Sequence, residues 1–140
     1  MPIYGIGIDT STISRMQTVL ERTPSVRDRL FCAQEQADAL QRGPIGSPPW
    51  VRYLTGAFAL KEAVAKAMGT GFREMAWQDI RTHRNASGKP EVLLAGVATV
   101  VATRLDIEVI HVSLTREGDQ VTAIAIAECA RAPQSGMHAG

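Results

Sequence analysis

The chain has 140 residues, of which 45% are hydrophobic, and this length suits one compact domain with a core of its own. A formal net charge of +1 argues against a nucleic-acid-binding or membrane-surface protein. The two cysteines form no metal spacing or disulfide framework, and no signal peptide or membrane-spanning run is recognisable, so we predict a cytoplasmic protein with reduced thiols. We expect one domain over residues 1–131 and a flexible tail over residues 132–140.

The first half of the chain predicts one strand followed by helices. Residues 3–9 alternate glycine with Ile and Tyr, as in a strand that another backbone approaches closely. Short helical pieces are expected between residues 13 and 40, where apolar residues recur at helical spacing. The main helix should begin near Pro49 and run to about Met68, before a turn over residues 69–71.

The second half predicts strands. Alternating or β-branched stretches suggest two hairpin-like units with a short helix between them, at residues 79–84, 90–94, 97–104 (the helix), 109–115 and 121–128. The expected fold class is therefore α+β, with an antiparallel sheet packed against one long helix and several short helices.

Three charges interrupt the alanine-rich main helix. Glu62 and Lys66 are neighbours on one helix face, and Glu followed four residues later by Lys is a favoured surface ion pair. The alternative is a phosphate site beside the glycine turn, where Lys61 and Lys66 would bind phosphate oxygens and Glu62 a metal ion.

Asp9 ends the predicted first strand and allows two interpretations. An aspartate here is common near the N-terminal cap of a helix. It could equally join Glu62 in holding Mg²⁺, because Mg²⁺ usually takes one or two carboxylates together with substrate phosphates and water.

A histidine and two hydroxyls form a polar row on the strand before the last hairpin turn. His111, Ser113 and Thr115 alternate with Val112 and Leu114, so the two sets should face opposite sides of the sheet. A histidine in a strand is often structural. The row would nevertheless suit a phosphorylated ligand.

Four segments together resemble a known family: GIGID, FALKEAVAKAMGTG, WQDI with the following GKP, and HVSLTREGD. In this order and spacing they resemble the short, single-domain holo-acyl-carrier-protein synthases of the 4'-phosphopantetheinyl transferase superfamily. The similarity covers the chain from Ile3 to about Glu128.

The resemblance implies a fold, a reaction and a set of site residues. Members of the family move the phosphopantetheine arm of coenzyme A to a serine of an apo acyl carrier protein, with Mg²⁺, and release adenosine 3',5'-bisphosphate. Such a phosphoryl transfer depends mainly on positioning and charge. By position, Asp9 and Glu62 match metal ligands, and Glu62, Lys66 and His111 match catalytic residues. The implied coenzyme A contacts are Lys61, Lys66, Gly69, Gly88, Pro90, His111 and Ser113.

The same resemblance implies two kinds of partner. An acidic carrier protein would dock on the first helix, where Arg15 and Arg22 could otherwise be ordinary solvated arginines. Family members of this length are homotrimers with sites at subunit interfaces.

Three residues depart from the family pattern: Thr12, Ala57 and Arg116. An arginine usually stands at position 57, and Arg52 or Arg116 could replace its charge. A specialised or less active transferase therefore stays open, as does a non-catalytic module that binds carrier protein or coenzyme A.

Overall fold

The computed structural model describes residues 1–130, so the predicted tail lies outside the described residues and the single-domain prediction is not tested. In chain order the helices and strands are β1 (Ile3–Thr12), α1 (Ile13–Arg22), α2 (Val26–Leu30), α3 (Ala33–Arg42), α4 (Pro48–Met68), the 3-10 helix η1 (Trp77–Asp79), β2 (Ile80–Arg84), β3 (Pro90–Leu94), α5 (Gly96–Arg104), β4 (Ile107–Glu117) and β5 (Gln120–Cys129). The predicted α+β class is confirmed.

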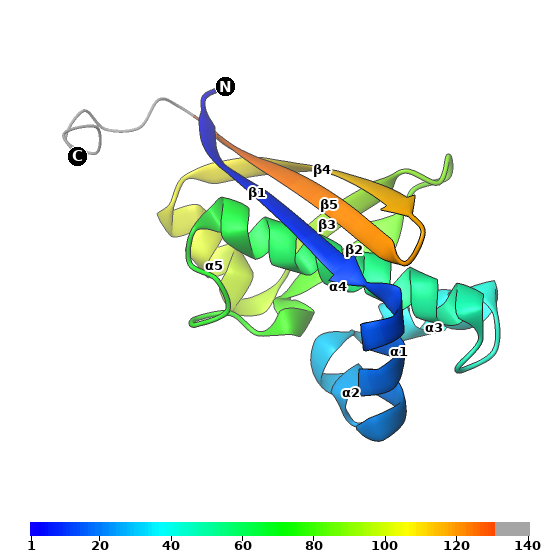
Figure 1. Ribbon diagram of the computed structural model, residues 1–140. Coiled ribbons are helices and arrows are strands. Elements are labelled where there is room, and N and C mark those ends of the chain that lie inside the picture. Colours follow the sequence, from blue (N-terminus) through cyan, green and yellow to red (C-terminus); the bar gives the residue numbers. More distant parts are fainter. Residues whose placement is uncertain (131–140) are drawn as a thin grey trace.

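The strands form two antiparallel sheets, where the sequence suggested one. The larger has the order β1-β5-β4, and β2 and β3 form a separate two-stranded sheet (Figure 1). Both predicted hairpins are present, as β2-β3 and β4-β5. The pairing of β1 with β5 makes the last described strand the central one of the larger sheet.

Helix α4 packs on one face of the larger sheet, and small residues let it lie very close to β1. A Cβ atom on Gly7 would lie only 1.8 Å from the carbonyl oxygen of Ala63, and one on Gly5 only 2.2 Å from that of Ala67. The two backbones are therefore almost in contact. This explains why the predicted first strand alternates glycine with larger residues.

The short helices α1, α2 and α3 gather around the first half of α4 (Figure 1). There Phe31, Trp50 and Leu54 belong to an apolar cluster that is separate from the core between α4 and the larger sheet. The start of α1 is bonded to Asp119, in the turn between β4 and β5. The Asp119 carboxylate accepts hydrogen bonds from the backbone N–H of Ser14 (3.1 Å) and from the Ser14 hydroxyl (2.5 Å). Across residues 1–130 we find no helix with the length and apolar character needed to span a bilayer.

The opposite face of the larger sheet carries exposed isoleucines. Ile6 and Ile8 on β1 are 60% and 59% exposed, and Ile124 on β5 is 37% exposed. Ile8 is paired with Ile124, and Ile124 in turn with Ser113, so these side chains share one face. We call this surface the isoleucine face.

Candidate functional site

Asp9, Glu62 and Lys66 come together where β1 passes α4. The Lys66 ammonium lies 3.3 Å from Oδ1 of Asp9 and donates to the carbonyl oxygen of Ile8 at 3.0 Å. Because β1 continues to Thr12, Asp9 is a strand residue and does not cap α1. We call these three residues the acidic cluster.

Glu62 is half-buried within this cluster. Burial raises the pKa of the Glu62 carboxyl, and the nearby Asp9 raises it further, whereas Lys66 acts in the opposite direction. Within residues 1–130, the ion pair that Lys66 makes is with Asp9, and none within 4.0 Å joins it to Glu62. The simple surface pair suggested by the sequence is therefore not what the structure contains.

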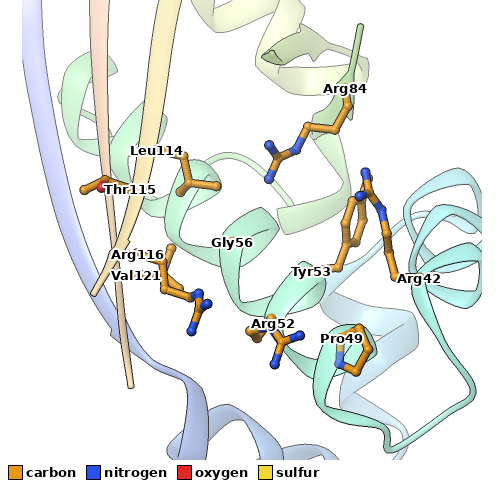
Figure 2. Close-up of a pocket in the computed structure, with 10 residues that line it drawn as sticks. All are labelled: Arg42, Pro49, Arg52, Tyr53, Gly56, Arg84, Leu114, Thr115, Arg116 and Val121. Carbon is orange, nitrogen blue, oxygen red and sulfur yellow. The ribbon is translucent and has the colours of Figure 1, made fainter. Parts of the chain in front are cut away.

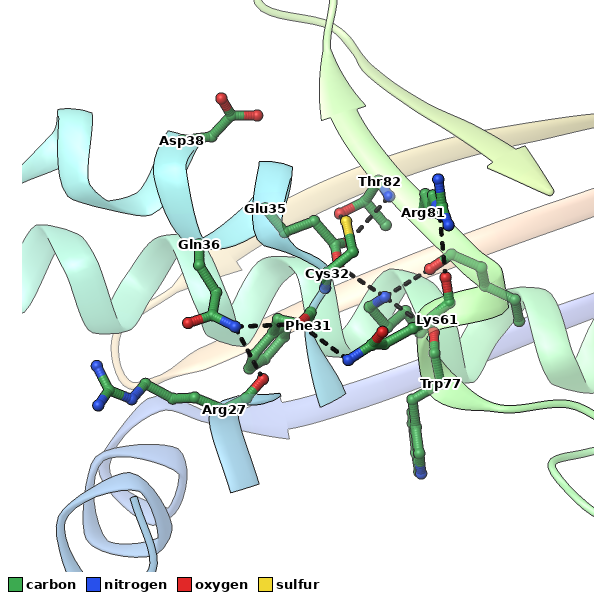
Figure 3. Close-up of polar contacts among 12 residues, drawn as sticks. Arg27, Phe31, Cys32, Glu35, Gln36, Asp38, Lys61, Trp77, Arg81 and Thr82 are labelled. Carbon is green, nitrogen blue, oxygen red and sulfur yellow. Dashed lines mark hydrogen bonds and ion pairs between the residues drawn. The ribbon is translucent and has the colours of Figure 1, made fainter. Parts of the chain in front are cut away.

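Lys61 is not part of this surface, which corrects its predicted role as a phosphate contact. Its side chain is 0% exposed, and its ammonium lies 2.9 Å from Oε1 of Glu35. It also donates to the carbonyl oxygens of Trp77 at 3.0 Å and Ile80 at 2.5 Å (Figure 3). An ammonium has three donor hydrogens, so these three acceptors account for all of them. Lys61 is a core residue here.

The two predicted glycines occupy turns. Gly69 ends α4 with a φ of 81°, and its N–H already donates to the carbonyl oxygens of Ala65 and Lys66. It is therefore a helix terminator whose amide is not free for a phosphate. Gly88, with a φ of 86°, lies in the β2-β3 turn, where its carbonyl oxygen accepts a hydrogen bond from Arg84 at 3.2 Å.

His111, Ser113 and Pro90 lie away from the acidic cluster. His111 and Ser113 are exposed on the isoleucine face, as the predicted alternation requires, and the His111 ring contacts the Glu128 carboxylate. His111 and Pro90 also line a groove of about 360 Å³ between β3 and β4. Asp9 points to the other face of the sheet, where it meets Lys66 on α4. A single copy of the described chain therefore separates the predicted catalytic residues.

A cavity rich in arginine opens between α3, α4, β2 and β4, with a volume of about 390 Å³ (Figure 2). Four different elements each supply one arginine. None of the described residues that line it carries a carboxylate. They are Arg42, Pro49, Arg52, Tyr53, Gly56, Arg84, Leu114, Thr115, Arg116 and Val121. A concave surface with this much positive charge is suited to an anion. We call it the arginine cavity.

Burial changes the titration of two groups that line the arginine cavity. It lowers the pKa of Arg84, and Arg42 also acts in that direction. Burial and the nearby Asp38 raise the pKa of Tyr53 to about 12, so its phenol stays a hydrogen-bond donor at neutral pH. The Arg42 guanidinium lies over the Tyr53 ring, 5.3 Å from its centre.

Ala57 stands where the resemblance predicts an arginine. Ala57 is buried, and it lines a small gap together with Tyr53 and Arg84. Arg84 thus reaches α4 from β2 next to Ala57. Of the charges in this cavity, the sequence suggested Arg52 and Arg116 but not Arg42 or Arg84, because only the folded chain brings these four elements together.

The predicted partner-binding residues Arg15 and Arg22 are exposed on α1. Among the residues that the structure describes, neither forms an ion pair within 4.0 Å. They are thus available to a negatively charged surface.

The chain is similar to proteins of one known superfamily. Residues 5–125 match the 4'-phosphopantetheinyl transferase superfamily, so the chain belongs to that superfamily. A holo-[acyl-carrier-protein] synthase of Alkaliphilus metalliredigens is 38% identical over 125 residues, which are 89% of this chain and 98% of the relative.

Solved structures show the same similarity in three dimensions. The holo-[acyl-carrier-protein] synthase of Neisseria meningitidis has a TM-score of 0.81 at 30% identity, and the match covers 90% of this chain and 98% of the other. The acyl carrier protein synthase of Plasmodium yoelii with ADP bound has a TM-score of 0.83 at 28% identity, covering 92% and 97% of the two chains. Within the superfamily, the similar proteins are thus enzymes of the holo-[acyl-carrier-protein] synthase type.

Proposed function

We propose that this protein transfers 4'-phosphopantetheine from coenzyme A to a serine of an apo acyl carrier protein, with Mg²⁺, and releases adenosine 3',5'-bisphosphate. The acidic cluster is the observation that carries this proposal. It places two carboxylates and a lysine close together, as a metal-dependent phosphoryl transfer requires. The superfamily and the named relatives support the same reaction.

The donor set of the acidic cluster fits Mg²⁺ bound together with a substrate. Within residues 1–130 no group of three or more His, Cys, Asp or Glu side chains could hold a metal. Two carboxylates are enough for Mg²⁺ when phosphates and water complete the coordination, so Asp9 and Glu62 would hold the ion. Bound there, the ion would supply positive charge to the diphosphate. The raised pKa of Glu62 is consistent with this, since burial and the nearby Asp9 both disfavour its ionised form in the free protein.

The reaction joins the serine Oγ to the phosphorus of the pantetheine phosphate and breaks its bond to the nucleotide. In the free protein the Lys66 ammonium partly neutralises Asp9, and its half-exposed side chain can move from there to a phosphate oxygen. Glu62 is our candidate to take the serine proton, because it is the half-buried carboxylate of the acidic cluster. The leaving nucleotide carries away the electron pair of the broken bond.

The arginine cavity would bind the phosphates of the nucleotide part of coenzyme A. The ADP in the Plasmodium yoelii relative is a ligand of the same chemical kind. Arg84 and Arg116 would supply the charge that Ala57 lacks. The groove that contains Pro90 and His111 is a second place where this donor could bind.

Two copies of the chain would be needed to complete the site. Tyr53 in the arginine cavity is about half a turn around α4 from Glu62, so the cavity and the acidic cluster lie on different sides of that helix. His111 lies on the isoleucine face, which remains exposed in the described chain. We infer that this face mediates assembly into a homotrimer in which one copy supplies the acidic cluster and its neighbour supplies His111.

The acceptor would dock on α1. Arg15 and Arg22 are exposed cations that would attract an acidic carrier protein. Enzyme and carrier would then meet in the cytoplasm, the location predicted from the sequence.

The direct test is to incubate the protein with coenzyme A, Mg²⁺ and apo carrier proteins and to weigh the carrier by mass spectrometry. We expect a gain of one phosphopantetheine group, which is lost with EDTA and with Asp9→Asn. Without any mass gain across fatty-acid and secondary-metabolic carriers, the transferase proposal fails and a binding module is the better interpretation.

A further inference from the structure

A fully buried ion pair lies one residue away from the acidic cluster. Lys61 and Glu35 are both 0% exposed, and Lys61 gives its three hydrogens to Glu35 and to the carbonyl oxygens of Trp77 and Ile80 (Figure 3). None of these contacts involves the arginine cavity or the isoleucine face. The pair is therefore a separate feature of the molecule.

The Glu35 carboxylate is equally occupied. Its Oε1 accepts from Lys61 and from the backbone N–H of Cys32 at 2.9 Å. Its Oε2 accepts from the backbone N–H of Thr82 at 2.9 Å and from the Thr82 hydroxyl at 2.6 Å. One carboxylate thus joins the start of α3, the middle of α4 and strand β2.

Stability alone is a weak reason for such a pair. Removing two charges from water is costly, and well-packed apolar residues are often as stabilising as a buried ion pair. What the pair does provide is direction, because its hydrogen bonds have fixed lengths and angles. It therefore fixes the position of Lys61 more closely than apolar packing would.

Glu62 lies between two residues of α4 that are held in place on different sides of the helix. Lys61 is held by the ion pair. Ala63 is held by β1, whose backbone approaches it so closely that Gly7 has no room for a Cβ atom. These contacts thus restrain α4 on both sides of Glu62.

We propose that Glu35 and Lys61 are positioning residues that hold Glu62 in the geometry needed for metal binding and transfer. This inference rests on the proposed function, since it assigns the pair to the same reaction. Glu62 touches the reacting groups in that proposal, and the buried pair acts only through it. A displacement of about 1 Å in a catalytic group can reduce turnover about 100-fold.

The test compares Lys61→Met with the double variant Glu35→Gln/Lys61→Met. The single variant leaves Glu35 buried without its counter-charge, so it is the one at risk of unfolding. The double variant removes both buried charges, and its glutamine oxygen still accepts hydrogen bonds from Thr82, although the Cys32 N–H loses its acceptor. Thr55→Val is the matched control, because Thr55 is fully buried in the same helix and bonds only within it, to the carbonyl oxygen of Val51.

Three quantities are measured on variants that near-UV circular dichroism shows to be folded: kcat, KM for coenzyme A, and Mg²⁺ affinity of the coenzyme A complex by calorimetry. We expect the double variant to lose about 10- to 100-fold in kcat and at least about tenfold in Mg²⁺ affinity, with KM within about twofold. Thr55→Val should keep all three. Glu62→Gln gives the calorimetric reference for a lost ligand.

The inference is overturned if the folded double variant keeps wild-type kcat and Mg²⁺ affinity. It is also overturned if KM rises while kcat is unchanged, since the pair would then support donor binding. If the wild-type protein transfers nothing, the proposed function has failed on its own. The difference in Mg²⁺ affinity between wild type and double variant then still decides whether the pair positions Glu62.

Discussion

Replacing Gly7 by alanine tests the close contact between β1 and α4 on which the acidic cluster depends. The new Cβ atom would lie 1.8 Å from the Ala63 carbonyl oxygen and 2.7 Å from the Ala67 nitrogen, whereas real Cβ atoms essentially never come within 3.0 Å of another atom. Both neighbours are backbone atoms, so no side chain can turn away. The strand and the helix would have to separate by more than about 1 Å.

The expected cost is at the upper end for an overpacked core, about 3 kcal/mol or more. For a chain of this size that lowers the melting temperature by roughly 10 °C. The same displacement would carry Asp9 away from Lys66 and Glu62, so we also expect transfer to be lost in the protein that remains folded.

Thermal and urea unfolding followed by circular dichroism measure this effect. Gly56→Ala is the matched control: its Cβ would lie 3.1 Å from Leu114 Cδ2, a flexible methyl that can yield, and alanine is favoured over glycine in a helix by about 1 kcal/mol. This control should be close to neutral. A Gly7→Ala protein within about 1 kcal/mol of wild type would refute the packing that we describe.

Three further outcomes are expected. Glu62→Gln should reduce transfer at least about 100-fold. Because burial and Asp9 raise the Glu62 pKa, the substitution should also make the free protein more stable above that pKa, and this gain in stability should disappear as pH falls to about 4. A variant less stable than wild type at pH 7 would contradict this explanation. Arg84→Gln should raise KM for coenzyme A about tenfold or more in steady-state assays, whereas the exposed Arg104→Gln should not, and equal KM values would argue against the arginine cavity as the donor site. Ile124→Lys should give monomers in sedimentation experiments and abolish transfer, while Val100→Lys, at an apolar and more exposed position on α5, should leave assembly intact; a trimeric Ile124→Lys protein would exclude the isoleucine face.

Local patterns in the sequence predicted most of the secondary structure. The alternation around His111 predicted strand β4, and the glycine–isoleucine repeat predicted strand β1. Both β-hairpins were found at the expected places. The pairing of β1 with β5 could not be predicted, because nothing local to either segment identifies a partner so far away in the chain. The sequence therefore indicated the elements and the fold class more reliably than their arrangement.

Of the predicted site residues on α4, the two that share a helix face lie together in the structure, whereas Lys61, on another face, lies apart from them. Glu62 and Lys66, four residues apart, do lie together with Asp9. Lys61 was grouped with them by its charge and by its position in the family motif. Its helical position is on the side of Leu54 and Val64, both buried, and a lysine on an apolar helix face is a signal for a buried partner. That partner, Glu35, likewise lies on the buried side of its own helix.

The central position of β5 has a consequence for how the chain is made. β1 pairs with β5, and the first turn of α1 is held by Asp119, 105 positions beyond Ser14. During synthesis the glycine-rich first strand leaves the ribosome long before the strand that pairs with it. The larger sheet therefore cannot assemble segment by segment, and contacts this distant in the chain make folding slow. We expect a nascent chain that stops before β5 to expose its apolar first strand and to depend on chaperones.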